Sequence, residues 1–220
     1  MTDKTPHTSI ERIGIDESGK GDYFGPLVIA AVFVDAITQG ELTLMNVRDS
    51  KKISDGRILE MAPDIRMLCP HSIIAIGPQR YNELYAKIRN LNRLLAWGHA
   101  KALETLLEKV SCGRAIADQF GDERLIVNAL QEKGRTIVLE QRPKAESDLA
   151  VAAASILARA EFLLRLKRLS DEIGTTLPKG ASPAVELAGR MIVKKHGKER
   201  LGLIAKLHFK TTQAVLGTIG

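Results

Sequence analysis

The chain has 220 residues, of which 45% are hydrophobic and 26% are charged, and its formal net charge is +6 at neutral pH. This length and apolar fraction suit one large folded unit, and the sequence shows neither a fixed-period repeat nor a long Gly/Ser/Pro linker. We therefore expect a single domain over residues 1–220, with 1–11 as a flexible N-terminus.

The sequence also argues against a membrane or secreted protein. No apolar run reaches the ~18 residues of a membrane-spanning helix. The N-terminal stretch MTDKTPHTSIERIG lacks the basic-then-apolar order of a signal peptide. The two cysteines, Cys69 and Cys112, are far from a C-x-x-C spacing, which favours reduced thiols. We expect a soluble, monomeric protein of the cytoplasm.

Positive charge is concentrated toward the C-terminus. Residues 159–210 contain 12 Lys or Arg against 5 Asp or Glu, which leaves the rest of the chain close to neutral. A basic face attracts a polyanion and makes its binding salt-dependent. A solvated surface that only keeps the protein in solution is an equally good interpretation of charge alone.

The first elements in the chain read as two strands joined by a tight loop. Residues 12–16 and 27–35 are rich in Ile and Val, and four glycines and a proline lie between them. Alternation of strands and helices then predicts an α/β domain with a mixed sheet. The later elements are expected as a helix at 54–68, a strand at 71–77, helices at 79–88 and 91–110, strands at 114–120 and 135–141 with a short helix between them, an Ala-rich buried helix at 147–169, and basic helices at 183–195 and 198–206.

The loop between the first two strands has two competing interpretations. Gly14 and the pair Gly19-Lys20 have the G-x-x-x-x-G-K spacing of a phosphate-binding loop. That motif requires a Ser or Thr after the lysine and a helix beginning there, whereas Gly21 and a β-branched run follow here. Acidic side chains inside the loop would also repel phosphate, so we prefer a metal-binding carboxylate site.

Asp16 and Glu17 are adjacent carboxylates at the end of the first strand. Like charges held close together raise each other's pKa, unless a cation lies between them. Magnesium prefers oxygen ligands and commonly uses a few carboxylates together with a substrate phosphate. Since strand neighbours point to opposite faces, both can reach one site only if the strand ends or bulges there. A pair of solvated loop acids is the alternative.

Further acids stand at the ends of other predicted elements. Asp118 closes the strand AIAD, and Glu146 precedes the Ala-rich helix, whose N-terminus favours an anion. Asp122 and Asp148 are close enough in sequence to be rivals for a fourth position. The sequence therefore predicts a carboxylate cluster and leaves its fourth member open.

Five motifs in this order resemble the type 2 ribonucleases H. They are GIDESGKGDYFGPLVIAAV (14–32), RDSKKIS (48–54), ADQF (117–120), KAESDLAVAAASILAR (144–159) and KLHFKTT (206–212). Within that family, ESGKG and DQF resemble ribonuclease HIII more than ribonuclease HII. The resemblance runs from about residue 13 to 212, nearly the whole chain.

The resemblance implies a ribonuclease H-like fold, a mixed five-stranded sheet flanked by helices, with basic helices at the C-terminus. It implies an endonuclease that cuts the RNA strand of RNA/DNA hybrids and leaves 5′-phosphate and 3′-hydroxyl ends, with Mg²⁺ or Mn²⁺ in a two-metal site. By the family pattern, Asp16, Glu17 and Asp118 bind the metal, and Glu146 is the fourth catalytic acid, with Asp122 or Asp148 as alternatives.

The resemblance also suggests which residues meet the substrate. The loop Gly19-Lys20-Gly21 resembles the family element that approaches the scissile backbone, where glycines allow close contact. Lys51, Lys52 and Lys144 are candidates for phosphate contacts.

One departure from the ribonuclease HIII pattern concerns the N-terminus. That group usually carries an N-terminal substrate-binding domain of several dozen residues, and only about a dozen residues precede the first strand here. We expect that domain to be absent and hybrid affinity to come from the catalytic domain and its basic helices. Ribonuclease HII-like cutting at single ribonucleotides in DNA, and a non-catalytic hybrid-binding protein, are the alternatives.

Overall fold

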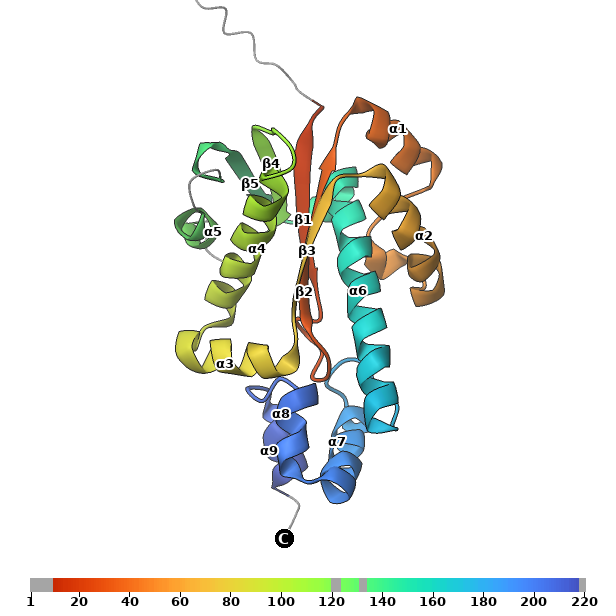
Figure 1. The fold of residues 1–220 in the computed structure, drawn as a ribbon, viewed down its shortest axis with the longest axis vertical. Helices are drawn as coiled ribbons and strands as arrows, with labels where there is room; N and C mark the ends of the chain where they lie inside the picture. The colour runs from red at the N-terminus through yellow and green to blue at the C-terminus, as the bar shows by residue number, and fades with distance from the viewer. Residues whose placement is uncertain (1–9, 120–123, 131–133, 218–220) are drawn as a thin grey trace, which may run out of the picture.

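A central sheet of five strands organises the protein in the computed structural model, which describes residues 10–119, 124–130 and 134–217 (Figure 1). The strands lie in the order β3-β2-β1-β4-β5. The pairs β1–β2 and β2–β3 are antiparallel, and β1–β4 and β4–β5 are parallel, so the predicted mixed sheet is confirmed. Their bounds are β1 Arg12–Ser18, β2 Leu27–Val34, β3 His71–Ile76, β4 Arg114–Asp118 and β5 Val138–Arg142.

The two faces of the sheet are covered by different helices. Side chains alternate along a strand, so Ile13 and Ile15 of β1 pack with α4 (Leu91–Leu107) on one face. Val28 and Val32 of β2 pack with α6 (Leu149–Ile173) on the other. Figure 1 shows α3 (Pro78–Ile88), α4 and α5 (Arg124–Ala129) on the first face and α1 (Ala36–Leu44), α2 (Asp55–Leu68) and α6 on the second.

Helix α6 (Leu149–Ile173) lies close on the sheet, as its run of alanines predicts. Gly14 of β1 makes this possible, because a Cβ at this position would be 2.1 Å from the main-chain carbon of Ala150. The helix begins at the N-cap Asp148 and ends at Gly174, whose φ of +63° suits a glycine. The first turns of α6 are therefore fixed beside the middle of β1.

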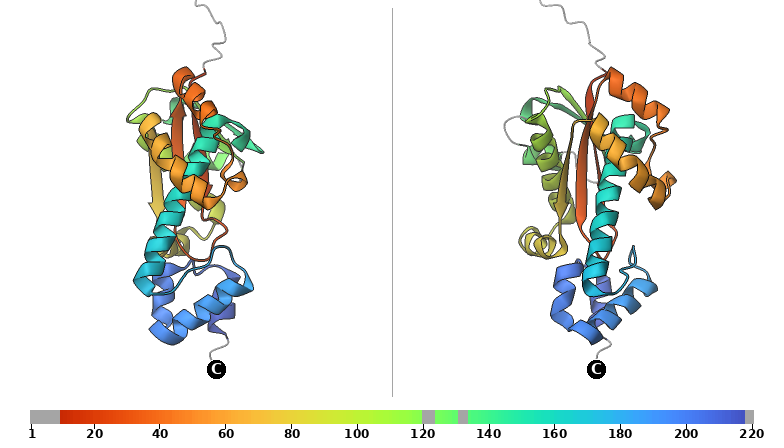
Figure 2. Two further views of the ribbon diagram at one scale, coloured as in Figure 1. Left: turned by 90° about the vertical axis from the view of Figure 1, so that its right-hand side faces the viewer. Right: turned by 45° about the vertical axis from the view of Figure 1, so that its right-hand side comes forward.

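A separate group of helices lies beyond one end of the sheet. The views in Figure 2 agree that α7, α8 and α9 gather at the C-terminal end of α6. The remaining helices have the bounds α1 Ala36–Leu44, α2 Asp55–Leu68, α3 Pro78–Ile88, α5 Arg124–Ala129, α7 Pro183–His196, α8 Leu201–Ile204 and α9 Lys210–Leu216.

Several details differ from the sequence prediction. Helices α1 and α9 were not predicted. Strand β5 begins at Val138, because Gly134–Thr136 forms a 3₁₀ turn. The predicted helix at 198–206 is a 3₁₀ turn followed by the short α8, and the chain then extends at Ala205, which bridges to Phe24.

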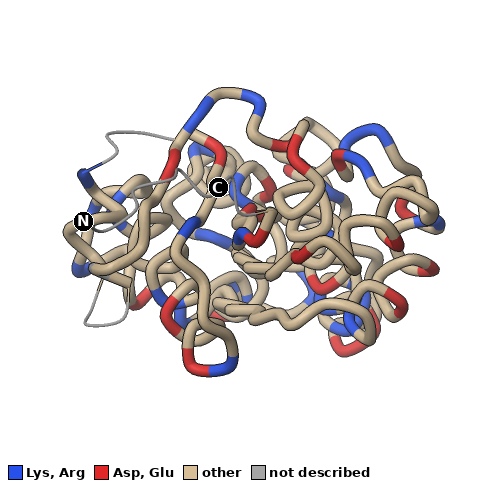
Figure 3. Tube along the Cα trace, turned by 90° about the horizontal axis from the view of Figure 1, so that it is seen from above, with Lys and Arg blue, Asp and Glu red and all other residues tan. Residues whose placement is uncertain are grey.

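The basic C-terminal region has fewer free positive charges than its composition suggests. Several of its cations pair with acids one helical turn away: Lys167 with Asp171, Arg165 with Glu161, and Arg190 with Glu186. Figure 3 shows Lys and Arg interspersed with Asp and Glu along the chain. Exposed lysines remain at the end of α7, at Lys194 and Lys195.

None of the helices in the described part of the chain combines the length and the apolar character needed to cross a membrane.

Candidate active site

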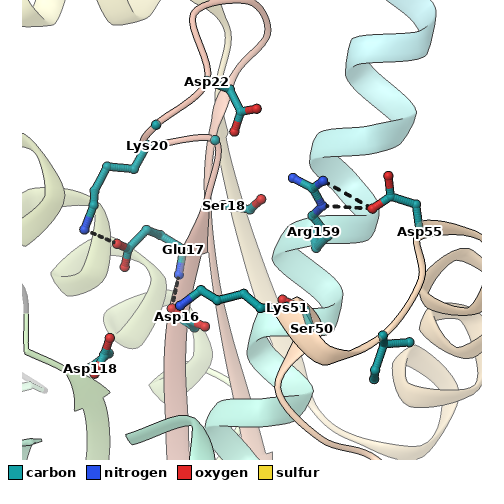
Figure 4. A pocket seen from close by; sticks show the side chains of 13 residues that line it. Asp16, Glu17, Ser18, Lys20, Asp22, Ser50, Lys51, Asp55, Asp118 and Arg159 are labelled. Atoms are coloured by element: carbon teal, nitrogen blue, oxygen red, sulfur yellow. Dashed lines mark hydrogen bonds and ion pairs between the residues drawn. The ribbon is translucent and has the colours of Figure 1, made fainter. Parts of the chain in front are cut away.

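An open pocket of about 470 Å³ lies where β1 leads into the glycine-rich loop (Figure 4). Strand β2 begins at Leu27 and pairs antiparallel with β1, so the helix that a phosphate-binding loop requires does not follow. The pocket is lined by Asp16, Glu17, Ser18, Gly19, Lys20, Gly21, Asp22, Ser50, Lys51, Ile53, Asp55, Asp118 and Arg159.

Asp16 and Asp118 come from neighbouring parallel strands. Ile15 of β1 is in register with Ala117 of β4, and the two aspartates are the next residues along their strands. Strand β4 ends at Asp118, which opens the sheet at this point. Carboxyl ends of neighbouring parallel strands are a common place for a binding site. The two predicted carboxylates are therefore brought to one pocket.

Glu17 reaches the same pocket at the end of β1, which stops at Ser18, one residue later; of the two possibilities, a strand end or a bulge, the structure has the strand end. Strand β1 keeps its regular pairing with β2 through Ser18, so Glu17 points to the opposite face from Asp16. The ends of β1 and β4 together give both acids access to one opening.

The charge of Asp16 is unfavourable in the protein alone. Burial raises the Asp16 pKa well above its ordinary value, and the nearby carboxylates of Glu17 and Asp118 raise it further. The main-chain amide of Glu17, which donates to Asp16 Oδ1 at 2.8 Å, and the ammonium of Lys51 act in the opposite direction. A cation in this pocket would relieve the repulsion.

Glu17 is held ionised by two partners. His99 Nε2 lies 3.1 Å from one carboxylate oxygen, and Lys20 Nζ lies 3.0 Å from the other. Burial alone would raise the Glu17 pKa, but the hydrogen bond and charge of His99, together with Lys20, lower it to about 2. Glu17 is therefore a negatively charged carboxylate at neutral pH, which is the form that can bind a cation.

Lys51 brings a positive charge to the acids from a separate segment. The 3₁₀ turn Ser50–Lys52 is capped by Asp49 and docked on α6, since the Ser50 amide donates to Ser155 Oγ at 3.0 Å. Burial lowers the Lys51 pKa, but the charges of surrounding acids outweigh it and raise it. These acids are Asp16, Asp49, Glu146 and Asp118. Figure 4 shows Lys51 extending across the pocket toward Asp16.

The candidates for the fourth acid differ in position. Glu146 does not line the pocket, although its charge acts on Lys51. Asp148 is engaged elsewhere: it caps α6 through the Ala150 amide at 2.8 Å and forms an ion pair with Arg12 at 2.7 Å. Asp122 lies outside the described residues.

The two glycines of the loop differ in their structural constraint. Gly19 has φ of +87°, and a Cβ there would be 2.2 Å from the carbonyl oxygen of Pro26. Gly21 lines the pocket, yet a Cβ there would meet nothing within 4 Å. The fold therefore requires glycine at position 19 and leaves open space at position 21.

The predicted substrate lysines separate into two groups. Lys20 and Lys51 line the pocket. Lys52 and Lys144 are exposed and are not among its lining residues. Ser155 is buried and donates to the Ala152 carbonyl oxygen at 3.0 Å.

The structure adds site residues to which the sequence reasoning gave no role. His99 of α4 is fully buried beside Glu17. Arg159 of α6 bonds to Asp55 Oδ1 at 3.2 Å, and both side chains line the pocket, while Lys179 contacts the other Asp55 oxygen. Arg159 lies inside a motif that resembles the family, which was its only sequence signal. No local pattern marked His99 or Asp55.

The acids of the pocket suit a hard divalent cation that retains water ligands. Within residues 10–119, 124–130 and 134–217, no group of three or more histidine, cysteine or acidic side chains is arranged to hold a metal ion. Mg²⁺ characteristically uses one or two carboxylates, several waters and a substrate phosphate, so three protein ligands are not needed. The raised pKa of Asp16 between two other carboxylates fits such an ion.

Comparisons with known proteins agree with this geometry. The family described as Ribonuclease HII matches residues 13–212. Ribonuclease HIII of Protochlamydia amoebophila is 50% identical over 218 residues, which cover 99% of this chain and 71% of that protein. Ribonuclease HIII of Chlamydia pneumoniae is 48% identical, covering 91% and 68%. The crystal structure of Bst-RNase HIII in complex with Mn²⁺ has a TM-score of 0.88 at 35% identity, covering 95% and 70%.

The mixed sheet with carboxylates at the ends of its central parallel strands defines a nuclease of the ribonuclease H-like class. The chain belongs to the type 2 ribonuclease H family, and its named relatives are ribonucleases HIII. It spans about 70% of the length of these relatives.

Proposed function

We infer that this protein is a metal-dependent endoribonuclease that hydrolyses the RNA strand of RNA/DNA hybrids. The main observation behind this assignment is that Asp16, Glu17 and Asp118 all line one open pocket, at the ends of β1 and β4. Family membership supports the substrate and the reaction, and favours neither a non-catalytic binding protein nor a ribonuclease HII-like preference for single ribonucleotides.

We propose that Asp16, Glu17 and Asp118 hold Mg²⁺ or Mn²⁺, as a pair of ions. Bst-RNase HIII, a structural neighbour, was crystallised with Mn²⁺. When bound, such a pair supplies a water activated for attack on phosphorus and stabilises charge on the leaving 3′-oxygen. His99 supports this role, because it holds Glu17 as a carboxylate with one oxygen fixed in direction.

The rest of the pocket is suited to orient the substrate phosphate. Lys51 is kept protonated by the surrounding carboxylates, so it can neutralise a phosphate oxygen. Arg159 presents a guanidinium on the other side of the pocket. Hydrolysis adds a water hydroxyl to phosphorus and a proton to the 3′-oxygen, which gives 5′-phosphate and 3′-hydroxyl ends.

We propose that the loop Gly19-Lys20-Gly21 meets the RNA backbone. Space around Gly21 lets a ribose approach the main chain, and main-chain groups can hydrogen-bond a 2′-hydroxyl, the group that separates RNA from DNA. Lys52 and Lys144 are proposed to contact phosphates outside the pocket, and the exposed lysines of α7 to hold the duplex further away. We also propose that the chain acts as a monomer in the cytoplasm.

Glu146 is the proposed fourth catalytic acid, because its charge acts on Lys51 together with Asp16 and Asp118. Asp148 is already committed to Arg12 and the start of α6. Single-turnover cleavage by Glu146→Gln and Asp122→Asn separates the remaining candidates. The true catalytic acid should lose orders of magnitude in rate, and the other variant should cleave nearly as the wild type does.

The function is tested with an end-labelled RNA/DNA hybrid beside a DNA duplex that contains one ribonucleotide. Both are incubated with Mg²⁺, with Mn²⁺ and with chelator, using wild type and Asp118→Asn. We expect metal-dependent cuts in the hybrid RNA that Asp118→Asn abolishes. Folded wild-type protein that cleaves neither substrate in either metal would contradict the enzyme assignment.

A further inference from the structure

Lys206 is a fully buried lysine outside the pocket. It lies in the extended segment after α8 with 0% of its surface exposed. A buried ammonium costs free energy unless its donors are satisfied. Its Nζ donates to the carbonyl oxygen of Asp22 at 2.7 Å and to that of Gly25 at 2.8 Å. The segment that receives these bonds is the glycine-rich loop of the pocket.

The same loop is bonded to the C-terminal region through its main chain. The Lys206 amide donates to the Tyr23 carbonyl oxygen at 2.9 Å, and the Gly25 amide donates to Ile204 at 2.9 Å. The Tyr23 amide donates to the Gly180 carbonyl oxygen at 2.9 Å. Residues 22–25 are thus held between two segments of the C-terminal region.

Asp22 completes this attachment beside the pocket. Its carboxylate accepts the Gly180 amide at 2.7 Å, and the residue also lines the pocket next to Gly21. Lys206 therefore holds the main chain at Asp22, one residue after Gly21 and two after Lys20. The position of this main chain determines where Gly21 and Lys20 lie.

Core packing alone does not require an amine at position 206. A methionine would fill a similar volume without the desolvation cost, but it would leave the carbonyls of Asp22 and Gly25 without their buried donor. The lysine is explained by the need to hold these carbonyls. Gly25, with φ of +83°, turns the chain back toward β2 at this point.

We propose that Lys206 is a positioning residue for cleavage, which fixes the glycine-rich loop so that Lys20 and Gly21 meet the substrate backbone in register with the carboxylates. Lys206 itself does not touch the substrate. The inference rests on the proposed hybrid-cleaving function. Misplacing a reacting group by about 1 Å can cost about 100-fold in rate, so a loosened loop should act on the cleavage step.

The test compares wild type with Lys206→Met and with Lys87→Met, which makes the same chemical change at an exposed lysine of α3. Three quantities are measured: hydrogen exchange of the Tyr23 and Gly25 amides, hybrid affinity in chelator, and single-turnover cleavage at saturating hybrid. We expect Lys206→Met to exchange these amides at least tenfold faster and to cleave ten- to 100-fold more slowly. Its hybrid affinity should change less than threefold, and Lys87→Met should match wild type.

A wild-type cleavage rate in folded Lys206→Met would overturn the proposal, as would unchanged amide exchange. If Lys206→Met does not fold, Lys206→Gln retains a donor for one carbonyl and should give an intermediate cleavage rate. Failure of both variants to fold would overturn the proposal in favour of a purely structural lysine. Absence of cleavage by wild type would instead contradict the proposed function, and the exchange measurement would still report whether Lys206 holds the loop.

Discussion

The paired substitutions Gly19→Ala and Gly21→Ala should separate a glycine that the fold needs from one that the substrate needs. At Gly19 the backbone has φ of +87°, and an added Cβ would lie 2.2 Å from the carbonyl oxygen of Pro26. The left-handed conformation costs an alanine about 1–2 kcal/mol, and relieving the clash costs about 1–3 kcal/mol more. We therefore expect Gly19→Ala to lower the free energy of unfolding by about 2–5 kcal/mol.

At Gly21 the added methyl group would meet nothing within 4 Å, so the free energy of unfolding should stay within about 0.5 kcal/mol of wild type. The same methyl group stands in the pocket, where it would hold a ribose away from the main chain. Losing about 1.4 kcal/mol of binding would raise KM for the hybrid about tenfold.

Urea unfolding and steady-state cleavage of an RNA/DNA hybrid, measured on both variants, distinguish these effects. A wild-type KM and kcat in Gly21→Ala would refute a substrate role for Gly21, since the open space would then serve no substrate. Unfolding of Gly19→Ala at the wild-type urea concentration would equally refute the structural need for glycine at position 19.

Three further changes probe the charges around the pocket. Asp118→Asn should slow single-turnover cleavage at least 100-fold while leaving the urea midpoint equal or higher, because it removes a charge that repels Asp16; a lower midpoint would mark Asp118 as structural. His99→Phe removes the bond that lowers the Glu17 pKa, so the acid limb of the pH–rate profile should move to higher pH, and an unmoved limb would contradict this role. Burial lowers the Lys206 pKa to about 7, against about 10.4 in the unfolded chain. Between these two pKa values the unfolded state binds more protons than the folded state does. The free energy of unfolding should therefore rise above pH 7, by up to about 1.4 kcal/mol per pH unit. Urea titrations of the chelated protein should show this slope in wild type and not in Lys206→Met.

Much of the sheet could be predicted from the sequence because its signals are local. The Ile- and Val-rich runs at 12–16 and 27–35 correspond to β1 and β2, and the alanines after Asp148 correspond to the buried start of α6. Helix α1 was missed although Asp35 and Thr38 form a capping box, since no strong apolar periodicity follows it. In residues 198–206, backbone pairing of Ala205 with Phe24 overrides the helical appearance of the sequence.

Only those residues of the candidate site that stand at strand ends or in recognisable motifs could be predicted from the sequence. Asp16 and Asp118 meet because β4 lies parallel beside β1. The sequence signal for this meeting is that each of the two acids closes an apolar strand. The partners that control charge come from remote elements. His99 is 82 residues from Glu17, and Asp55 is 104 residues from Arg159. Such pairs depend on how helices pack over the sheet, which residue spacing does not encode.

The length of α6 has a mechanical consequence. One uninterrupted helix runs from the start of β1, where its N-cap Asp148 pairs with Arg12, past Arg159 at the pocket, to the group of C-terminal helices (Figure 2). At 1.5 Å per residue, the part from Arg159 to Ile173 spans about 21 Å. The helix thus fixes the distance between the pocket, where we propose that the RNA is cut, and the lysines of α7. Deleting one residue from this part would shorten it by only about 1.5 Å but turn the far end by about 100°, which would move those lysines away from the duplex contacts that we propose for them.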